Sequence, residues 1–158
     1  MSSANMKRVQ GSKGVEPIVC LNPVKGLWRV RMDITETDDG AEWLEHDFDH
    51  RPTSKELRSL YNEYTDGQVK DKILTGMTYD GVKIYLSEEN QRNFLSAFFV
   101  PAEFKVGEDD EGNAVYKKFT LLTKLTAFKT AVFTHIQQCL KEGWSKKDGF
   151  DVSPYLRE

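Results

Sequence analysis

Hydrophobic and polar residues follow one arrangement three times along this chain: two alternating apolar runs around a glycine-containing turn, and then an amphipathic stretch that starts at Ser or Thr. Alternation with a period of two predicts a half-buried strand, and a period near 3.6 predicts a helix. The sequence therefore predicts an α+β fold of three successive ββα units, with antiparallel hairpins packed against three helices. The turns are Asp38–Gly40, Asp80–Gly81 and Asp110–Asn113, and the helix starts are Thr53, Ser87 and Thr120.

The same pattern predicts where the folded part begins and ends. Residues 1–25 mix Gly, Ser, Lys and Pro without periodicity and are expected to form an N-terminal arm, in which Val15–Leu21 is the one apolar stretch. Residues 26–150 are expected to form a single α+β domain of the three ββα units, and residues 151–158 a C-terminal tail. A chain of 158 residues is long enough for one domain with its own core.

The first hairpin has the clearest strand pattern, because apolar residues alternate with polar ones on both sides of its turn. A three-residue loop with Gly40 in the left-handed conformation pairs residues whose numbers sum to 78. In this register Arg31 lies opposite Asp47 on the solvent-facing side of the hairpin. The other expected pairs are Arg29 with Asp49, Asp33 with Glu45, Ile34 with Leu44, Met32 with His46, and Val30 with Phe48.

The helices carry start and stop signals. Thr53 and Glu56 form a capping box, Ser87 is an N-cap, Pro101 is expected to end the second helix, and Gly143 the third. The apolar stripes are Leu57, Leu60, Tyr61 and Tyr64, then Phe94, Leu95, Phe98 and Phe99, and then Leu121, Leu125, Phe128, Val132, Ile136, Cys139 and Leu140, in a third helix of about Leu121–Glu142. The later strands are expected at Ile73–Tyr79 with Val82–Leu86, where Met77 faces Ile84, and at Ala102–Gly107 with Ala114–Phe119.

Composition and charge disfavour several classes of protein. The content of 39% hydrophobic and 30% charged residues is typical of soluble globular proteins, and no apolar run approaches the ~20 residues that span a bilayer. Met1–Gly14 lacks the apolar segment of a signal peptide, and the two cysteines, Cys20 and Cys139, make no disulfide framework. A net charge of −3 gives no general affinity for phosphate backbones. We expect neither membrane nor nucleic acid as a partner.

The run His46–His50 has the residue types of a metal site, but not the geometry. On a strand, His46 and His50 point to one face while Asp47 and Asp49 point to the other, so that four ligands cannot converge. In the predicted register, both aspartates also lie opposite arginines. We therefore expect no metal here.

Two further clusters have simple structural explanations. The Glu108–Asn113 loop resembles a calcium loop, but Thr120 stands where an EF-hand has its bidentate Glu, which favours a solvated hairpin turn. Cys139 and His135 are neighbours on a helix, but Cys139 lies on the apolar stripe, which favours a buried, unreactive thiol. The sequence has no GxSxG, Walker-type, GxGxxG or HExxH motif. It predicts no catalytic residues and no cofactor.

Five residues in two segments are candidates for contact with a partner. Asn90 and Gln91 begin the buried face of the second helix; their amides are expected to hydrogen-bond the adjacent hairpin, and a ligand contact is the alternative. Trp144 follows the expected stop at Gly143 and is accompanied by Lys146 and Lys147. It either anchors a neighbouring subunit or folds back over the third helix, since aromatic burial favours both.

Short motifs between Leu74 and Phe150 resemble a domain of unknown function from phage and prophage tail modules. They are similar to the C-terminal domain of many phage tail-fibre assembly proteins, and Leu27–Ile34 extends the resemblance to members with a preceding strand pair and helix. The connection after Phe98–Pro101 is shorter than in the family. The motifs are Thr75-Gly76, Tyr79-Asp80-Gly81, Leu86-Ser87-Glu88-Glu89-Asn90-Gln91, Phe104-Lys105-Val106-Gly107, Leu122-Thr123-Lys124-Leu125-Thr126-Ala127-Phe128 and Gly143-Trp144-Ser145-Lys146-Lys147-Asp148.

The resemblance implies a non-enzymatic tail-associated protein, either a virion structural component or a tail-fibre assembly factor. Its partners would be phage structural or tail-fibre proteins, in the virion or in the bacterial host cytoplasm, and self-association stays open. The first alternative is a small phage-encoded regulatory or counter-defence protein that binds a host protein. The less favoured alternative is a metal-dependent enzyme, which would rest on the His/Asp and Cys/His clusters alone.

Overall fold

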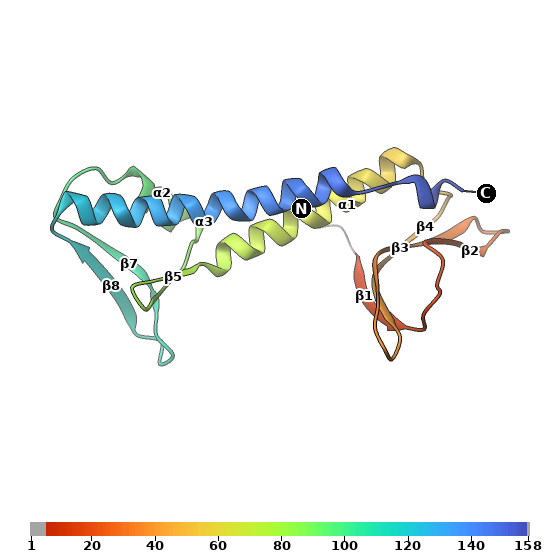
Figure 1. The fold of residues 1–158 in the computed structure, drawn as a ribbon, viewed down its shortest axis with the longest axis horizontal. Coiled ribbons are helices and arrows are strands. Elements are labelled where there is room, and N and C mark those ends of the chain that lie inside the picture. The colour runs from red at the N-terminus through yellow and green to blue at the C-terminus, as the bar shows by residue number, and fades with distance from the viewer. Residues whose placement is uncertain (1–5, 158) are drawn as a thin grey trace. The chain divides into compact units, whose positions relative to one another are not determined.

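The computed structural model describes residues 6–157, and its ribbon is shown in Figure 1. The described residues form three α-helices, one 3₁₀ helix and eight strands in antiparallel sheets, which confirms the predicted α+β fold. In chain order the elements are β1 (Lys7–Gly11), β2 (Ile18–Asn22), β3 (Leu27–Glu36), β4 (Ala41–Phe48), α1 (Ser54–Thr75), β5 (Met77–Tyr79), β6 (Val82–Ile84), α2 (Glu88–Ser96), β7 (Ala102–Glu108), β8 (Ala114–Phe119), α3 (Leu122–Gly149) and η1 (Ser153–Tyr155).

The chain divides into two compact subdomains. Subdomain 1 is drawn from Met1–Gly67 and Lys146–Glu158, and subdomain 2 from Gln68–Ser145, so that α1 and α3 contribute residues to both. This division differs from the predicted arm, single domain and tail, because residues 6–67 and 146–157 belong to one subdomain. Residues 1–5 of the predicted arm and Glu158 of the predicted tail lie outside the described residues.

Subdomain 1 contains a four-stranded sheet in the order β1-β4-β3-β2. The outer strands come from the segment that was expected to be an aperiodic arm, so that expectation is wrong for residues 7–11 and 18–22. β1 pairs with β4, and β2 pairs with β3. The two strands have five residues each and contain no fully buried side chain. Backbone hydrogen bonds to β4 and β3 therefore hold these strands in the sheet. Because no side chain is fully buried, the sequence of the two strands shows no alternation of apolar and polar residues that would predict them.

The core of subdomain 1 joins the sheet to the first turns of α1. α1 begins with the predicted capping box, in which the Thr53 amide donates to Glu56 Oε1 (3.1 Å) and the Glu56 amide donates to Thr53 Oγ1 (3.2 Å). The predicted tail belongs to this core as well, because Tyr155 of η1 is buried. The buried residues are Val30, Met32, Leu44, Leu57, Leu60, Tyr61 and Tyr155.

The phenol group of Tyr155 is a buried hydrogen-bond donor, and it donates to the carbonyl oxygen of Arg31 (2.7 Å). Tyr155→Phe leaves that carbonyl without this partner and is expected to lower the free energy of unfolding by about 1–3 kcal/mol. Urea denaturation followed by circular dichroism measures the loss. The matched control is Tyr116→Phe, at an exposed position on β8, for which a change within about 0.5 kcal/mol is expected. Equal losses in both variants would contradict this assignment.

The register of the first hairpin differs from the predicted one. Arg29 faces Asp47 and Arg31 faces Glu45, so that paired numbers sum to 76 instead of 78. One residue of the shift comes from the loop, since Glu36 pairs with Ala41. The other comes from a bulge between Met32 and Thr35, where Asp33 has a φ of 50°. A shift of two preserves the faces of a strand, so the buried positions of Val30 and Met32 are as predicted.

Subdomain 2 packs two short hairpins and α2 around one side of α3. The turn at Asp80–Gly81 and the pairing of Met77 with Ile84 are as predicted, and both turn residues have positive φ. Ile73 was expected in the first strand but belongs to α1, which continues to Thr75. The buried residues are Ile73, Ile84, Leu86, Phe94, Val106, Phe119, Leu125, Phe128, Val132 and Cys139.

Two expected helix ends are wrong. α3 continues through Gly143, which is buried and does not adopt the left-handed conformation that ends a helix. The helix ends at Gly149, where the ring of Phe150 stacks on Tyr61 with centroids 4.4 Å apart. α2 ends at Ser96, before Phe98 and Phe99, which were expected on its buried side and are exposed instead.

Candidate protein-binding surface

α3 has a second apolar side beside the one that faces the core of subdomain 2. Leu122, Phe133 and Trp144 have exposed fractions of 54%, 54% and 50%. Each is eleven residues from the next, which corresponds to three full helical turns plus a rotation of about 20°. The three side chains therefore lie on one side of the helix. A soluble protein exposes single apolar side chains routinely, but a row of three along one helix is unusual.

This side of α3 is also poor in charge. Between Leu122 and Trp144 the charged residues are Lys124, Lys129, Lys141 and Glu142. At 100° per residue, Lys124 and Glu142 lie on the opposite side of the helix from Phe133, so that Lys129, and Lys141 at the edge, are the charges nearest to the row. Between Leu122 and Trp144, the exposed residues within about 80° of Phe133 on the helix are Thr123, Thr126, Thr130 and Lys141, three of which are uncharged. Depletion of charge together with exposed aromatic residues is the composition of the centre of a protein interface.

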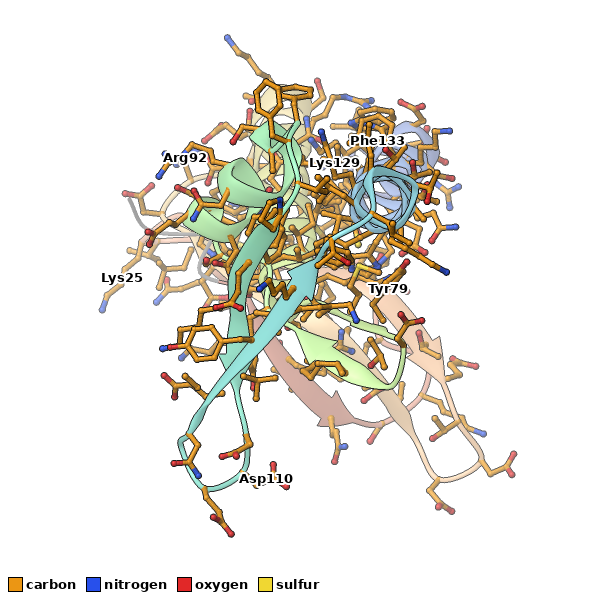
Figure 2. The ribbon with its side chains drawn as sticks, turned by 90° about the vertical axis from the view of Figure 1, so that its left-hand side faces the viewer. Lys25, Tyr79, Arg92, Asp110, Lys129 and Phe133 are labelled. Atoms are coloured by element: carbon orange, nitrogen blue, oxygen red, sulfur yellow. The ribbon has the colours of Figure 1, made fainter. Side chains whose placement is uncertain are left out.

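The segment that follows α2 adds Phe98 to this surface, and Phe99 is the next residue of the chain. Phe98 and Phe99 are 67% and 86% exposed. Lys129 fixes the segment to α3, because its Nζ donates to the carbonyl oxygen of Ala97 (2.7 Å) and lies 4.0 Å from the centroid of the Phe98 ring. Figure 2 shows Lys129 and Phe133 on the part of α3 that points away from the β7–β8 hairpin. The α3 face consists of Phe98, Phe99, Leu122, Lys129, Phe133 and Trp144.

Among the predicted partner-binding residues, Trp144 lies on the α3 face. It is part of a continuous helix and does not mark the point where the chain leaves the core. Lys146 and Lys147 form the last turn of α3 in subdomain 1, where Lys147 makes an ion pair with Asp66 and Lys146 is exposed. Sequence reasoning missed Phe98, Phe99 and Phe133; the eleven-residue spacing from Leu122 and Trp144 was a detectable signal for Phe133 alone.

Asn90 and Gln91 have the structural role that was favoured for them. The amide nitrogen of Asn90 donates to the carbonyl oxygen of Tyr85 (2.9 Å), and that of Gln91 donates to Leu86 (2.8 Å). Ser87 caps the helix by accepting a hydrogen bond from the Asn90 amide (3.1 Å). These bonds fix α2 to the end of the preceding hairpin and satisfy backbone groups there.

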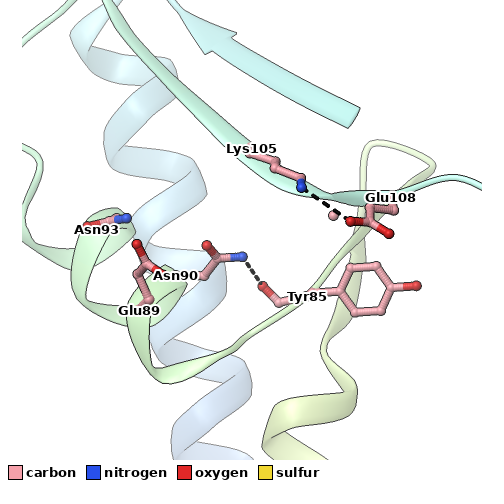
Figure 3. A pocket seen from close by; sticks show the side chains of 7 residues that line it. Tyr85, Glu89, Asn90, Asn93, Lys105 and Glu108 are labelled. Carbon is pink, nitrogen blue, oxygen red and sulfur yellow. Dashed lines mark hydrogen bonds and ion pairs between the residues drawn. The ribbon is translucent and has the colours of Figure 1, made fainter. Parts of the chain in front are cut away.

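A pocket of about 480 Å³ lies beside the start of α2 (Figure 3). Its charged groups partly neutralise each other, since Lys105 Nζ lies 3.2 Å from Glu108 Oε1. Gly107 makes room for the ring of Tyr85, because a Cβ at this position would lie 2.1 Å from that ring. The pocket is a polar depression whose lining residues contact one another. It consists of Tyr85, Glu89, Asn90, Asn93, Lys105, Gly107 and Glu108.

Asp47, Asp49 and His50 of the His46–His50 run pair with protein side chains. Arg29 makes two hydrogen bonds to Asp47, of 2.8 and 3.0 Å, which hold the pKa of Asp47 below its ordinary value. His50 lies 2.6 Å from both Asp49 and Glu56, and these contacts raise its pKa. No three His, Cys, Asp or Glu side chains within residues 6–157 are placed to hold a metal ion.

The acidic loop between β7 and β8 is a hairpin turn. Asp109 Oδ1 accepts hydrogen bonds from the amides of Asn113 (2.9 Å) and Glu111 (3.0 Å), and these bonds lower the pKa of Asp109. The carboxylate that would be a calcium ligand therefore organises the turn.

Cys139 is 2% exposed, and burial raises the pKa of its thiol. We expect that a thiol reagent modifies one equivalent quickly under native conditions, at the partly exposed Cys20, and that Cys139 reacts only on unfolding. The test is thiol titration with and without denaturant, with Cys20→Ser as the control that removes the fast phase. A fast phase that persists in this variant would contradict the buried position of Cys139.

Comparisons of the chain with protein-family models, with curated proteins and with solved structures give no match. Within residues 6–157, every helix is too short or too polar to cross a membrane.

Proposed function

We propose that this protein is a non-enzymatic component of a phage tail module that acts by binding other proteins through the α3 face. It serves either as a structural part of the virion or as a tail-fibre assembly factor. The α3 face carries the proposal for protein binding, and the motif resemblance between Leu74 and Phe150 supports the phage setting.

The composition of the α3 face supports a protein partner over a small molecule. Small-molecule sites are concave and enclose their ligand, whereas this surface is an exposed helix side and an adjoining segment. Aromatic side chains dominate binding energy at protein interfaces, and the face has four of them, Phe98, Phe99, Phe133 and Trp144. Lys129 anchors the segment that carries Phe98, so part of the surface is ordered before a partner binds.

The test is incorporation into phage particles. Epitope-tagged full-length chain is expressed during phage production, particles are purified on a density gradient, and their proteins are quantified by mass spectrometry. The expected result is a fixed ratio of the chain to the tail proteins, or a stable complex with a tail-fibre protein outside the particle. Phe133→Asp is expected to abolish the association, because it puts a carboxylate at the centre of the face.

The matched control is Tyr116→Asp, which introduces the same charge at an exposed aromatic residue of β8 outside the α3 face. Equal loss with both substitutions would overturn the choice of surface. A chain that is absent from particles and from tail-fibre complexes, and that binds a purified host protein instead, would overturn the tail role in favour of a regulatory one.

A further inference from the structure

We infer that the α3 face is a two-fold self-association surface, on which α3 of a second copy packs antiparallel with the symmetry axis at Phe133. This inference rests on the proposed role of the α3 face in protein binding and names its partner. It begins from the spacing of the exposed row, because Phe133 lies eleven residues from Leu122 and eleven from Trp144.

An antiparallel two-fold pairing makes each residue face the residue at the same distance on the other side of the axis. Phe133 then meets Phe133 of the second copy, and Leu122 meets Trp144 of the second copy at both ends. The three half-exposed apolar side chains of one copy thus all find apolar partners. Leu122 and Trp144 are separated by about 33 Å of helix at 1.5 Å per residue.

Charge selects the antiparallel arrangement over a parallel one. The charged residue of the face is Lys129, whose counterpart across an axis at Phe133 is Gln137. A parallel two-fold pairing would instead place Lys129 against Lys129 of the second copy, a like-charge contact that opposes association. The antiparallel pairing avoids this repulsion without any change of conformation.

The same charges favour a second copy over a partner of opposite charge. An acidic partner needs a cluster of cations, whereas the face has the single cation Lys129, with Lys141 at its edge. An uncharged, apolar surface of matching length is the complement that fits, and the α3 face of a second copy has these properties.

The available surface is sufficient for a specific dimer. An aromatic side chain buries about 150–250 Å². The exposed portions of Phe98, Phe99, Phe133 and Trp144 from two copies therefore supply on the order of 1,000 Å², which is the lower limit for a specific interface. Leu122 and the surrounding threonines add to this area.

The experiment is sedimentation equilibrium of the full-length chain over a concentration series up to about 100 μM. The wild type is expected to fit a monomer–dimer equilibrium. Phe133→Asp puts two carboxylates against each other at the axis and is expected to weaken the dimer at least about 100-fold. Its melting temperature at a monomeric concentration should stay close to that of the wild type, because residue 133 is exposed. Trp144→Ala should weaken the dimer in the same way.

Gln137→Glu tests the direction of the pairing. In the antiparallel register the new carboxylate faces Lys129 of the second copy, so the dimer is expected to tighten, and to lose that gain in high salt. The control is Gln138→Glu, which adds the same charge one position away from the face. A dimer weakened by Gln137→Glu would overturn the antiparallel register.

A wild-type chain that is monomeric at about 100 μM, or that forms an oligomer other than a dimer, would overturn the inference. These outcomes are separate from the failure of the proposed function. A monomer that enters particles through Phe133 leaves the tail role intact. A dimer that never associates with particles or fibre proteins supports self-association and overturns the tail role.

Discussion

Phe128→Ala is expected to lower the free energy of unfolding by about 3–5 kcal/mol, because it opens a large cavity at the centre of subdomain 2. Phe128 is fully buried, and its ring contacts four others: Tyr79, Phe94, Phe104 and Phe119, with centroids 4.9–6.2 Å apart. Removal of the ring takes away the shared neighbour of β5, α2, β7 and β8. The loss is measured by urea denaturation with circular dichroism as the probe.

The matched control is Phe133→Ala, the same substitution on the same helix at a side chain that is 54% exposed. At a concentration where the chain is monomeric, a change within about 1 kcal/mol is expected, since most of that ring already contacts solvent. Similar losses in the free energy of unfolding for the two variants would contradict the assignment of Phe128 to the buried side of α3 and of Phe133 to its exposed side. Such a result would also remove the basis of the α3 face.

The parts of the fold that could be predicted from the sequence are those that local residues determine. The capping box of Thr53 and Glu56 needs only four consecutive residues, and the Asp80–Gly81 turn needs two. Both lie in the structure where the sequence placed them. The hydrogen bonds that the side-chain amides of Asn90 and Gln91 donate were also predictable, because their acceptors are only five residues away.

The first hairpin shows what local patterns cannot determine. Its register depends on a bulge at Asp33, where the residue has a φ of 50° although the sequence gives a left-handed signal only at Gly40. The carboxylate of Asp33 accepts a hydrogen bond from the hydroxyl of Tyr61 on α1 (3.2 Å). This contact, across 28 residues of sequence, favours the bulge and cannot be read from the alternation of the strand.

Of the residues of the α3 face, the sequence analysis selected Trp144 alone as a candidate partner contact, and it did so from a helix end that is wrong. Trp144 was selected because Gly143 resembles a helix stop, whereas the helix continues past it. Phe98 and Phe99 were expected in the core, where Phe94 of the same segment is in fact buried. The sequence does not show which of several neighbouring aromatic residues the core has room for, because packing around Phe128 decides it.

Gly76→Ala is expected to destabilise subdomain 2 by about 3 kcal/mol through the backbone rather than through lost packing. Gly76 follows the last residue of α1 and has a φ of +89°, a conformation that costs an alanine about 1–2 kcal/mol. A Cβ at this position would also lie 2.0 Å from the carbonyl oxygen of Ile84. β6 would have to move away from the end of α1, and this displacement supplies the rest of the loss.

Gly81→Ala separates the two contributions to the Gly76→Ala effect. Gly81 has a φ of +74°, close to that of Gly76, but a Cβ there meets nothing within 4 Å. The Gly81 substitution should therefore cost only the conformational part, about 1–2 kcal/mol, and the difference between the two variants gives the cost of moving β6. Both are measured by urea denaturation under the same conditions. Equal losses for Gly76→Ala and Gly81→Ala would show that β6 can move without a cost in free energy. The contact of Gly76 with Ile84 would then not hold the second hairpin against α1.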